Sequence, residues 1–133
     1  MTVTISHTTI DCRSAFELSE WWKTVLGYTD VPDDPNAAGD EECMIMDPDS
    51  GHKLLFIEVP HGDLPAKRIH FDVRPQMRSR DDEVLWLRSR GAELVADHRG
   101  IYGPGSGWVT LADPEGNYLC VLRSMAEVEP QSS

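Results

Sequence analysis

The chain has 133 residues, of which 23 are acidic and 12 basic, so it carries a formal net charge of -11 at pH 7. That charge excludes the cationic footprint that nucleic-acid binding needs, and no apolar run approaches the roughly 20 residues of a membrane helix. The three cysteines lack Cys-x-x-Cys spacing and no signal peptide is recognisable, so we expect free thiols in a cytoplasmic protein with neither nucleic-acid nor membrane partners.

The chain opens with patterns for a strand and a helix. Apolar and polar residues alternate over 3–11, which predicts a strand with His7 on one face. The pair Ser14 and Glu17 has the spacing of a capping box, in which the serine hydroxyl accepts an amide and the glutamate reaches back to the cap. Apolar residues then recur at helical spacing until Gly27, which predicts a left-handed helix end.

A hairpin and a further strand follow. The acidic segment 30–42 is interpreted as a solvated loop. Residues 44–57 read as strand, Asp-Pro turn with glycine, and strand, because proline fixes φ and glycine supplies a positive φ. After a connector, residues 68–73 alternate again and place on one face Arg68, His70 and Asp72.

The last third of the chain repeats this order. Ser79 with Asp82 predicts a second helix start, and Gly91 its end. Residues 100–107 are too rich in glycine for a regular element and are expected to form a flexible loop. The segment 108–122 is a second and stronger hairpin, with an Asp-Pro-Glu-Gly turn between two apolar strands.

The chain is therefore interpreted as two modules, about 3–60 and 67–123, each a strand, a helix and three strands. Neither module alone can bury both faces of its sheet, so we expect an α+β fold in which two βαβββ modules form one curved mixed sheet around a central cavity, with the helices outside. Residues 1–123 would form a single domain, and 124–133 a disordered tail.

The repeat and four short motifs resemble the vicinal oxygen chelate superfamily of glyoxalase I, bleomycin-resistance proteins, fosfomycin-resistance enzymes and extradiol dioxygenases. The resemblance covers residues 4–123 and is greatest to small bacterial glyoxalase-like domain proteins. The motifs are Asp-Cys at 11–12, Leu-Gly-Tyr at 26–28, Arg-x-His-x-Asp at 68–72 and Asp-Pro-Glu-Gly-Asn at 113–117. The resemblance also implies association into a homodimer, with Trp22 and Trp86 marking the interface if they are exposed.

Metal-dependent members of this superfamily place a ligand at each of four inward strand positions. Carried over by motif, these positions are His7, Leu55 or Phe56, Arg68 and Cys120. Only the first is a conventional ligand, and arginine would repel a cation. No cofactor is therefore expected. The alternative is a divalent metal held by neighbouring donors, namely His7, Glu58, His70 and Cys120.

The same residues can instead bind a small molecule. Arg68 would anchor an oxygen-rich or anionic group, and both histidines can donate, accept or shuttle a proton. Phe56 and Trp108 would supply apolar walls, with Tyr102 at the mouth. The predicted ligand-binding residues are His7, Phe56, Glu58, Arg68, His70, Tyr102, Trp108 and Cys120.

Several of these assignments have structural alternatives. Arg68 could form a buried salt bridge with Asp11 or Asp72, and His70 could be a satisfied core histidine. Asp11 and Asp72 occupy equivalent positions of the two modules, which favours the same structural role in both. Cys120 could be a nucleophile, or a buried inert thiol.

We therefore expect a glyoxalase/bleomycin-resistance-like protein that binds a small molecule in its central cavity without the metal quartet of glyoxalase I. Its acidic charge also leaves cationic ligands open. The alternative is an enzyme, either a lyase or isomerase or a metal-dependent oxygenase, that uses the candidate catalytic residues His7 and His70. A third hypothesis is an interaction module whose pocket is filled by its own side chains.

Overall fold

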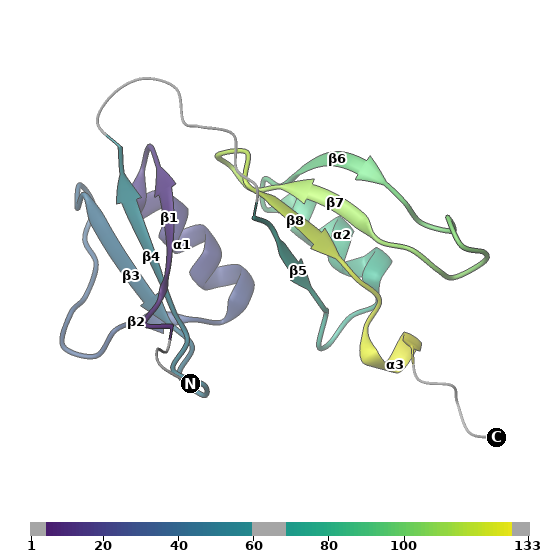
Figure 1. Ribbon diagram of the computed structural model, residues 1–133, viewed down its shortest axis with the longest axis horizontal. Coiled ribbons are helices and arrows are strands. Elements are labelled where there is room, and N and C mark those ends of the chain that lie inside the picture. Colours follow the sequence, from purple (N-terminus) through teal and green to yellow (C-terminus); the bar gives the residue numbers. More distant parts are fainter. Residues whose placement is uncertain (1–4, 60–68, 129–133) are drawn as a thin grey trace. The chain divides into compact units, whose positions relative to one another are not determined.

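The computed structural model describes residues 5–59 and 69–128. The chain divides into two units, Met1–Pro65 and Ala66–Ser133, and each unit contains a strand, a helix and three strands, to which the second unit adds a short C-terminal helix (Figure 1). The predicted α+β fold of two βαβββ modules is therefore confirmed. That the two modules share one curved sheet around a cavity, within one domain, stays a prediction.

The first unit is a four-stranded mixed sheet with one helix. Its strands lie in the order β1-β4-β3-β2, with β1 and β4 parallel and the other neighbours antiparallel. The elements are β1 (Thr8–Cys12), α1 (Ala15–Leu26), β2 (Thr29–Asp30), β3 (Glu42–Met46) and β4 (Lys53–Glu58). The first strand is predicted over 3–11, whereas β1 begins at Thr8 and ends at Cys12.

The start of α1 differs from the predicted capping box. Ser14 occupies the N-cap position in an extended conformation, but its side chain makes no capping hydrogen bond to the described first turn. The Ala15 amide instead donates to the Glu58 carboxylate, at 3.0 Å. A residue from a distant strand therefore satisfies an amide of the first turn for which the predicted capping box names no partner. The predicted helix end is confirmed, because Gly27 has a φ of 73°.

The Glu58 contact also identifies which face of the sheet meets α1. Side chains alternate along a strand, so Leu54 and Phe56 point to the same side as Glu58. Both are buried, as are their partners on β3, Cys43 and Ile45. With Leu18 and Trp22 of α1 they form the apolar core of this unit.

The second unit repeats the first. Its strands lie in the order β5-β8-β7-β6, with β5 and β8 parallel and the other neighbours antiparallel. The elements are β5 (Phe71–Val73), α2 (Arg80–Ser89), β6 (Glu93–Asp97), β7 (Val109–Ala112), β8 (Tyr118–Val121) and α3 (Met125–Val128). The core of the unit consists of Val84, Leu87, Val109, Leu111, Leu119 and Val121. The predicted cap of α2 is confirmed, since the Ser79 hydroxyl accepts the Asp82 amide.

The turn between β7 and β8 is held by one buried carboxylate. Asp113 accepts the amides of Glu115 and Asn117 and the side-chain amide of Asn117, at 2.7 to 2.9 Å. Gly116 has a φ of 84° and closes the turn. The turn fixes the register of the hairpin, in which Thr110 lies beside Cys120.

Three expectations need correction or qualification. The tail predicted to be disordered from residue 124 contains α3, in which the Glu127 amide donates to the Ser124 hydroxyl. Trp22 is fully buried and packs edge-on against Trp21, so it does not mark an exposed interface. Trp86 is half-buried beneath Arg78, whose guanidinium lies 4.8 Å from its ring centroid.

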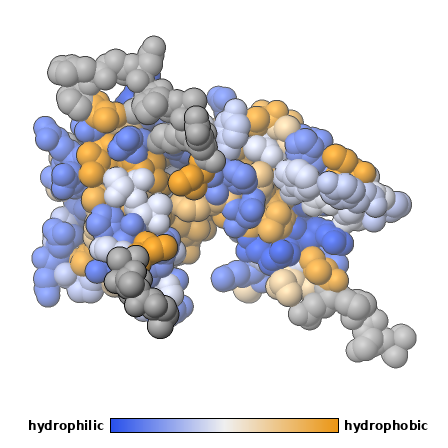
Figure 2. Space-filling view, in the orientation of Figure 1, coloured by the Kyte–Doolittle hydropathy of each residue, from blue (hydrophilic) through white to orange (hydrophobic). Residues whose placement is uncertain are grey.

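The surface agrees with the charged composition. Hydrophilic side chains cover much of the visible surface of each unit, with apolar patches between them (Figure 2). All three cysteines, Cys12, Cys43 and Cys120, are buried thiols that take part in no disulfide bond. Among the described helices, none combines the length and the apolar character that crossing a membrane requires.

Replacing Glu58 tests the observed cap of α1. Glu58→Ala removes the acceptor of the Ala15 amide and should lower the free energy of unfolding by about 1 kcal/mol, as measured by urea denaturation. Glu17→Ala is the matched control, because the predicted capping box has Glu17 bind the cap amide of Ser14. This substitution should lower the free energy of unfolding by less. A larger loss for Glu17→Ala would restore the capping box.

Candidate functional site

A group of polar side chains shares one face of the second sheet. The parallel pairing of β5 with β8 places Asp72 beside Cys120, and the β7–β8 hairpin places Thr110 on the other side of Cys120. His70 precedes Asp72 by two residues and therefore points to the same side. These four residues define what we call the polar face. The alternating residues Leu111, Leu119 and Val121 are buried in the core with α2.

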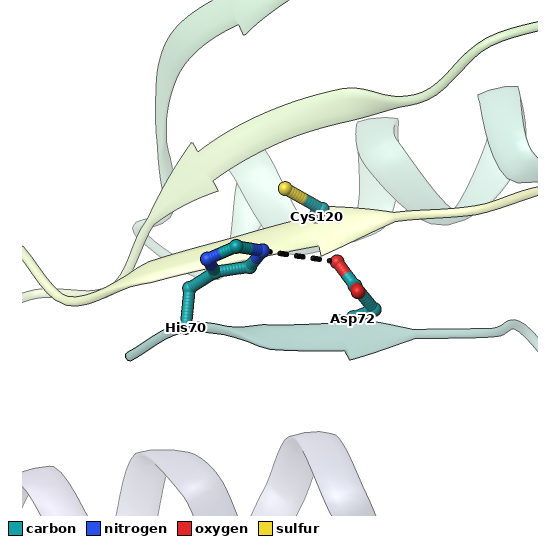
Figure 3. A group of neighbouring side chains, drawn as sticks. All are labelled: His70, Asp72 and Cys120. Carbon is teal, nitrogen blue, oxygen red and sulfur yellow. Dashed lines mark ion pairs between the residues drawn. The ribbon is translucent and has the colours of Figure 1, made fainter. Parts of the chain in front are cut away.

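The polar face brings three chemically different groups together (Figure 3). The His70 Nε2 atom lies 3.2 Å from Asp72 Oδ1, within ion-pairing distance. One ligand atom each of His70, Asp72 and Cys120 lies within 4.8 Å of the other two. The Thr110 hydroxyl is 3.3 Å from the Cys120 sulfur. An imidazole, a carboxylate and a thiol thus converge on one point.

Burial decides between some of the earlier alternatives. The side chains of His70 and Asp72 are 49% and 58% exposed, so His70 is not a core histidine. Cys120 is only 8% exposed. The cluster therefore combines a sheltered sulfur with two accessible groups that can meet a ligand.

An aromatic group lies at the start of β7. Trp108 is two residues before Thr110 and precedes the strand on the same alternating side. Its ring centroid lies 4.7 Å from that of His98 and 6.4 Å from that of Tyr102, with both pairs tilted. Tyr102 is largely exposed. The structure thus brings together two predicted ligand-binding residues, Trp108 and Tyr102, and adds His98.

The glycine-rich loop that carries Tyr102 is held by buried polar contacts. The guanidinium of Arg80, which is 6% exposed, donates to the carbonyls of Ser106 and Gly107 at 2.8 and 3.1 Å. Gly107 has a φ of 87°, and a Cβ atom there would lie 1.9 Å from the His98 carbonyl oxygen. The loop predicted to be flexible is therefore anchored at its C-terminal end.

The ion pair between Asp97 and Arg99 lies at the other end of this loop. Arg99 donates to both carboxylate oxygens of Asp97, and its hydrogen bonds lower the pKa of Asp97 to about 2. Arg99 also reaches Asp81 on α2. Burial raises the pKa of Asp81, but hydrogen bonds from Arg80 and Arg99 outweigh it and hold the pKa below its ordinary value.

Other predicted site residues lie elsewhere. Phe56 and Glu58 face α1, so Phe56 belongs to the core of the first unit and does not supply the predicted apolar wall of a ligand site. In the parallel pairing of β1 with β4, Thr9 is the partner of Leu55, so their side chains lie on the same side of the sheet. His7 is two residues before Thr9 and, if the alternation continues, lies on that side too. His7 itself is half-buried, with Nδ1 2.9 Å from the Ser6 hydroxyl. Arg68 lies outside the described residues, so its role as an anchor stays a prediction.

The four metal positions implied by the resemblance do not fit a metal. Leu55 and Phe56 have no ligand atom, and the carboxylate of Glu58, the substitute donor, is bound to the Ala15 amide on the opposite face. Of the alternative donor set, His70 and Cys120 lie together within the second unit, where Asp72 joins them.

Sequence reasoning did not select Thr110, His98 or Arg80. A signal for Thr110 was present, because the Asp-Pro-Glu-Gly turn at 113–116 sets its pairing with Cys120. Arg80 and His98 gave no such signal, because their contacts depend on the path of the glycine loop.

Comparison with known proteins identifies the relatives of this chain. The profile of a family described as "Glyoxalase-like domain" matches residues 7–122. Among curated proteins, none is a significant match.

Two solved structures illustrate the similarity in fold. One is a point mutant of the fosfomycin resistance protein FosX from Listeria monocytogenes, complexed with Mn(II) and 1S,2S-dihydroxypropylphosphonic acid. It is 15% identical, with 96% of this chain and 94% of that chain covered and a TM-score of 0.65. The other is a glyoxalase/bleomycin resistance protein/dioxygenase family enzyme from Burkholderia phytofirmans PsJN. It is 16% identical, with 90% and 97% covered and a TM-score of 0.66.

A pair of glycine substitutions tests how the loop is held. Gly107→Ala should destabilise the protein by about 2 kcal/mol or more and change the near-UV circular dichroism of Trp108, because the new Cβ meets the His98 carbonyl. Gly105→Ala is the control, since its φ is also positive, at 76°, but no atom lies within 4 Å of the added Cβ. Equal losses in the two variants would show that backbone strain alone matters.

The Asp97–Arg99 pair predicts a pH dependence. A carboxyl whose pKa is lowered from 3.8 to about 2 contributes stability above about pH 4, and this contribution is lost as the pH falls toward 2. Asp97→Asn should therefore lower the melting temperature at pH 7, and its difference from the unmodified protein should shrink between pH 4 and pH 2. Glu93→Gln on the same strand is the control. A difference that stays constant over this range would contradict the assignment.

Proposed function

We propose that this chain, which belongs to the glyoxalase-like domain family of the vicinal oxygen chelate superfamily, binds a compact, partly aromatic small molecule on the polar face of its second sheet. The observation that carries the proposal is the placement of an aromatic group and a polar cluster along one strand face. The Trp108 side chain lies at one end of this face, and Thr110, Cys120, Asp72 and His70 follow.

The chemistry of the face suggests how a ligand would lie. An aromatic ring of the ligand would pack against Trp108 and Tyr102, whose own rings are already tilted toward one another. A hydroxyl or amine of the ligand would donate to the exposed carboxylate of Asp72, and His70 could either donate or accept. Arg68, chosen from the sequence, remains our candidate for holding an anionic oxygen.

The anchored loop supports a binding role, because it gives the aromatic end a defined geometry. Arg80 and the Asp97–Arg99 pair fix the loop on both sides of Tyr102. A site whose parts are already positioned loses less conformational entropy when a ligand binds. His7 stays a predicted participant from the first unit.

One observation favours a second candidate function, catalysis by proton transfer. His70 lies 3.2 Å from Asp72, which is placed to orient the imidazole and to stabilise its protonated form. An exposed and oriented imidazole could act as acid or base in a lyase or isomerase reaction. His7→Ala or His70→Ala would then abolish turnover while binding is retained, whereas binding without turnover favours the first proposal.

The binding proposal is tested with three small aromatic probes that differ in charge: salicylate, catechol and tyramine. Saturation-transfer NMR with the full chain in the presence of EDTA should detect binding of at least one probe. Trp108→Ala should weaken that binding about fivefold, corresponding to the loss of about 1 kcal/mol of aromatic packing.

Trp86→Phe is the control, because Trp86 lies under Arg78 on α2 and is not part of the polar face. Binding of a probe that is weakened equally by both substitutions, or by neither, would contradict the proposed position. Absence of binding by all three probes would contradict the proposed ligand class.

A further inference from the structure

We propose that His70, Asp72 and Cys120 together bind one zinc ion per chain, at a site that shares only Cys120 with the four positions implied by the family resemblance. The inference deepens the proposed function, on which it rests for the role of the ion, since the site lies on the same polar face. Zinc binding itself can be measured without any small molecule.

The geometry of the three side chains suits a tetrahedral ion. Bond lengths of 2.0–2.3 Å to nitrogen, oxygen and sulfur place two ligand atoms of one zinc ion about 3.3 to 3.6 Å apart. The observed separation of His70 Nε2 and Asp72 Oδ1 is 3.2 Å. The Cys120 sulfur lies within 4.8 Å of one ring nitrogen of His70 and of one carboxylate oxygen of Asp72. A closure of about 1 Å is therefore sufficient, and the exposed side chains of His70 and Asp72 have room to make it.

The backbone already fixes the spacing of the ligands. Asp72 and Cys120 are direct partners on adjacent parallel strands, so their side chains start side by side. His70 lies two residues before Asp72 on the same side, a distance of about 6.6 Å along a strand. The His70 side chain leans along the strand toward Asp72 and so closes this gap. Two elements of the fold thus position all three groups.

The donor set matches zinc in chemistry and in charge. Imidazole, carboxylate and thiolate are the three classes of protein ligand that zinc accepts. A carboxylate and a thiolate together balance the charge of a divalent ion. The Thr110 hydroxyl, 3.3 Å from the sulfur, is placed to donate a hydrogen bond to a thiolate. This bond would stabilise the charged form of Cys120 from the side opposite Asp72.

Three protein ligands leave one position of a tetrahedral ion open. Closed structural zinc sites use four ligands, whereas sites that meet substrates keep a position for water or another oxygen. The exposure of His70 and Asp72 puts that open position on the accessible side of the cluster. A hydroxyl or carboxylate oxygen of a small molecule packed on Trp108 is the ligand we assign to it.

The test uses the full chain, freed of metal with a chelator and titrated with zinc against a colorimetric zinc indicator. One equivalent should bind, and cobalt(II) in its place should give the sulfur-to-cobalt charge-transfer absorption of a thiolate ligand. Cys120→Ser should abolish that absorption. His70→Ala and Asp72→Asn should each weaken zinc binding at least about tenfold, and Thr110→Val about tenfold.

Matched controls separate this cluster from the other histidines, cysteines and acidic residues. His52→Ala removes an exposed histidine that pairs with Tyr28 in the first unit, and Cys43→Ala removes another buried thiol. Both controls should bind zinc as the unmodified chain does. Asp33→Asn in the acidic segment should also have no effect.

The outcomes separate this inference from the proposed function. Failure to bind one equivalent, or binding that survives both His70→Ala and Cys120→Ser, would overturn the zinc site, and the probe experiment in EDTA would be unaffected. Zinc binding at the cluster without binding of any aromatic probe would overturn the proposed ligand class and leave the zinc site standing. Binding lost only in Asp33→Asn would assign the ion to the acidic segment and overturn the inference.

Discussion

The parallel pairing of β5 with β8 is the constraint on which the candidate site depends. It joins the first and last strands of the second module and so brings Asp72 beside Cys120. A parallel pair needs a long crossover between its strands, and here α2, β6 and β7 provide that connection. The rest of the module, including the helix that fills its core, therefore serves to hold two short strands in register.

The same topology in the first unit gives a different result. There β1 and β4 are parallel partners, but the residues facing away from α1 include Thr9 and Leu55 and provide no comparable cluster of metal ligands among the described residues. The fold repeats, while the chemistry is concentrated in one copy. The two units therefore share a topology but differ in the side chains that their parallel strand pairs present.

Much of the fold could be predicted from the sequence because local signals carried it. Gly27 and Ser79 mark helix ends through backbone geometry and capping, and the Asp-Pro turns at 47–51 and 113–116 mark hairpins. Asp113 also determines the register that pairs Thr110 with Cys120, so part of the site was already encoded locally.

The errors arose where a residue's partner is distant in sequence. The carboxylate of Glu58 binds the amide of Ala15, which no local pattern shows, and Phe56, two residues earlier on the same strand, faces α1 as well. The side chain of Arg80 crosses from α2 to the glycine loop, so the loop is more ordered than its composition indicates. The repeat favours a structural role for Asp72. Its contact with His70 depends on the side-chain conformations of these two residues, which the repeat does not predict.

The most direct test of this account is a map of backbone amide shifts in the full chain as zinc is added to metal-free protein. The account predicts that the changes centre on residues 70–73 and 118–122 and on Thr110, with saturation at one equivalent. Changes centred on His7 or on the acidic segment 30–42 instead would contradict the claim that the polar face of the second sheet is the chemical centre of this protein.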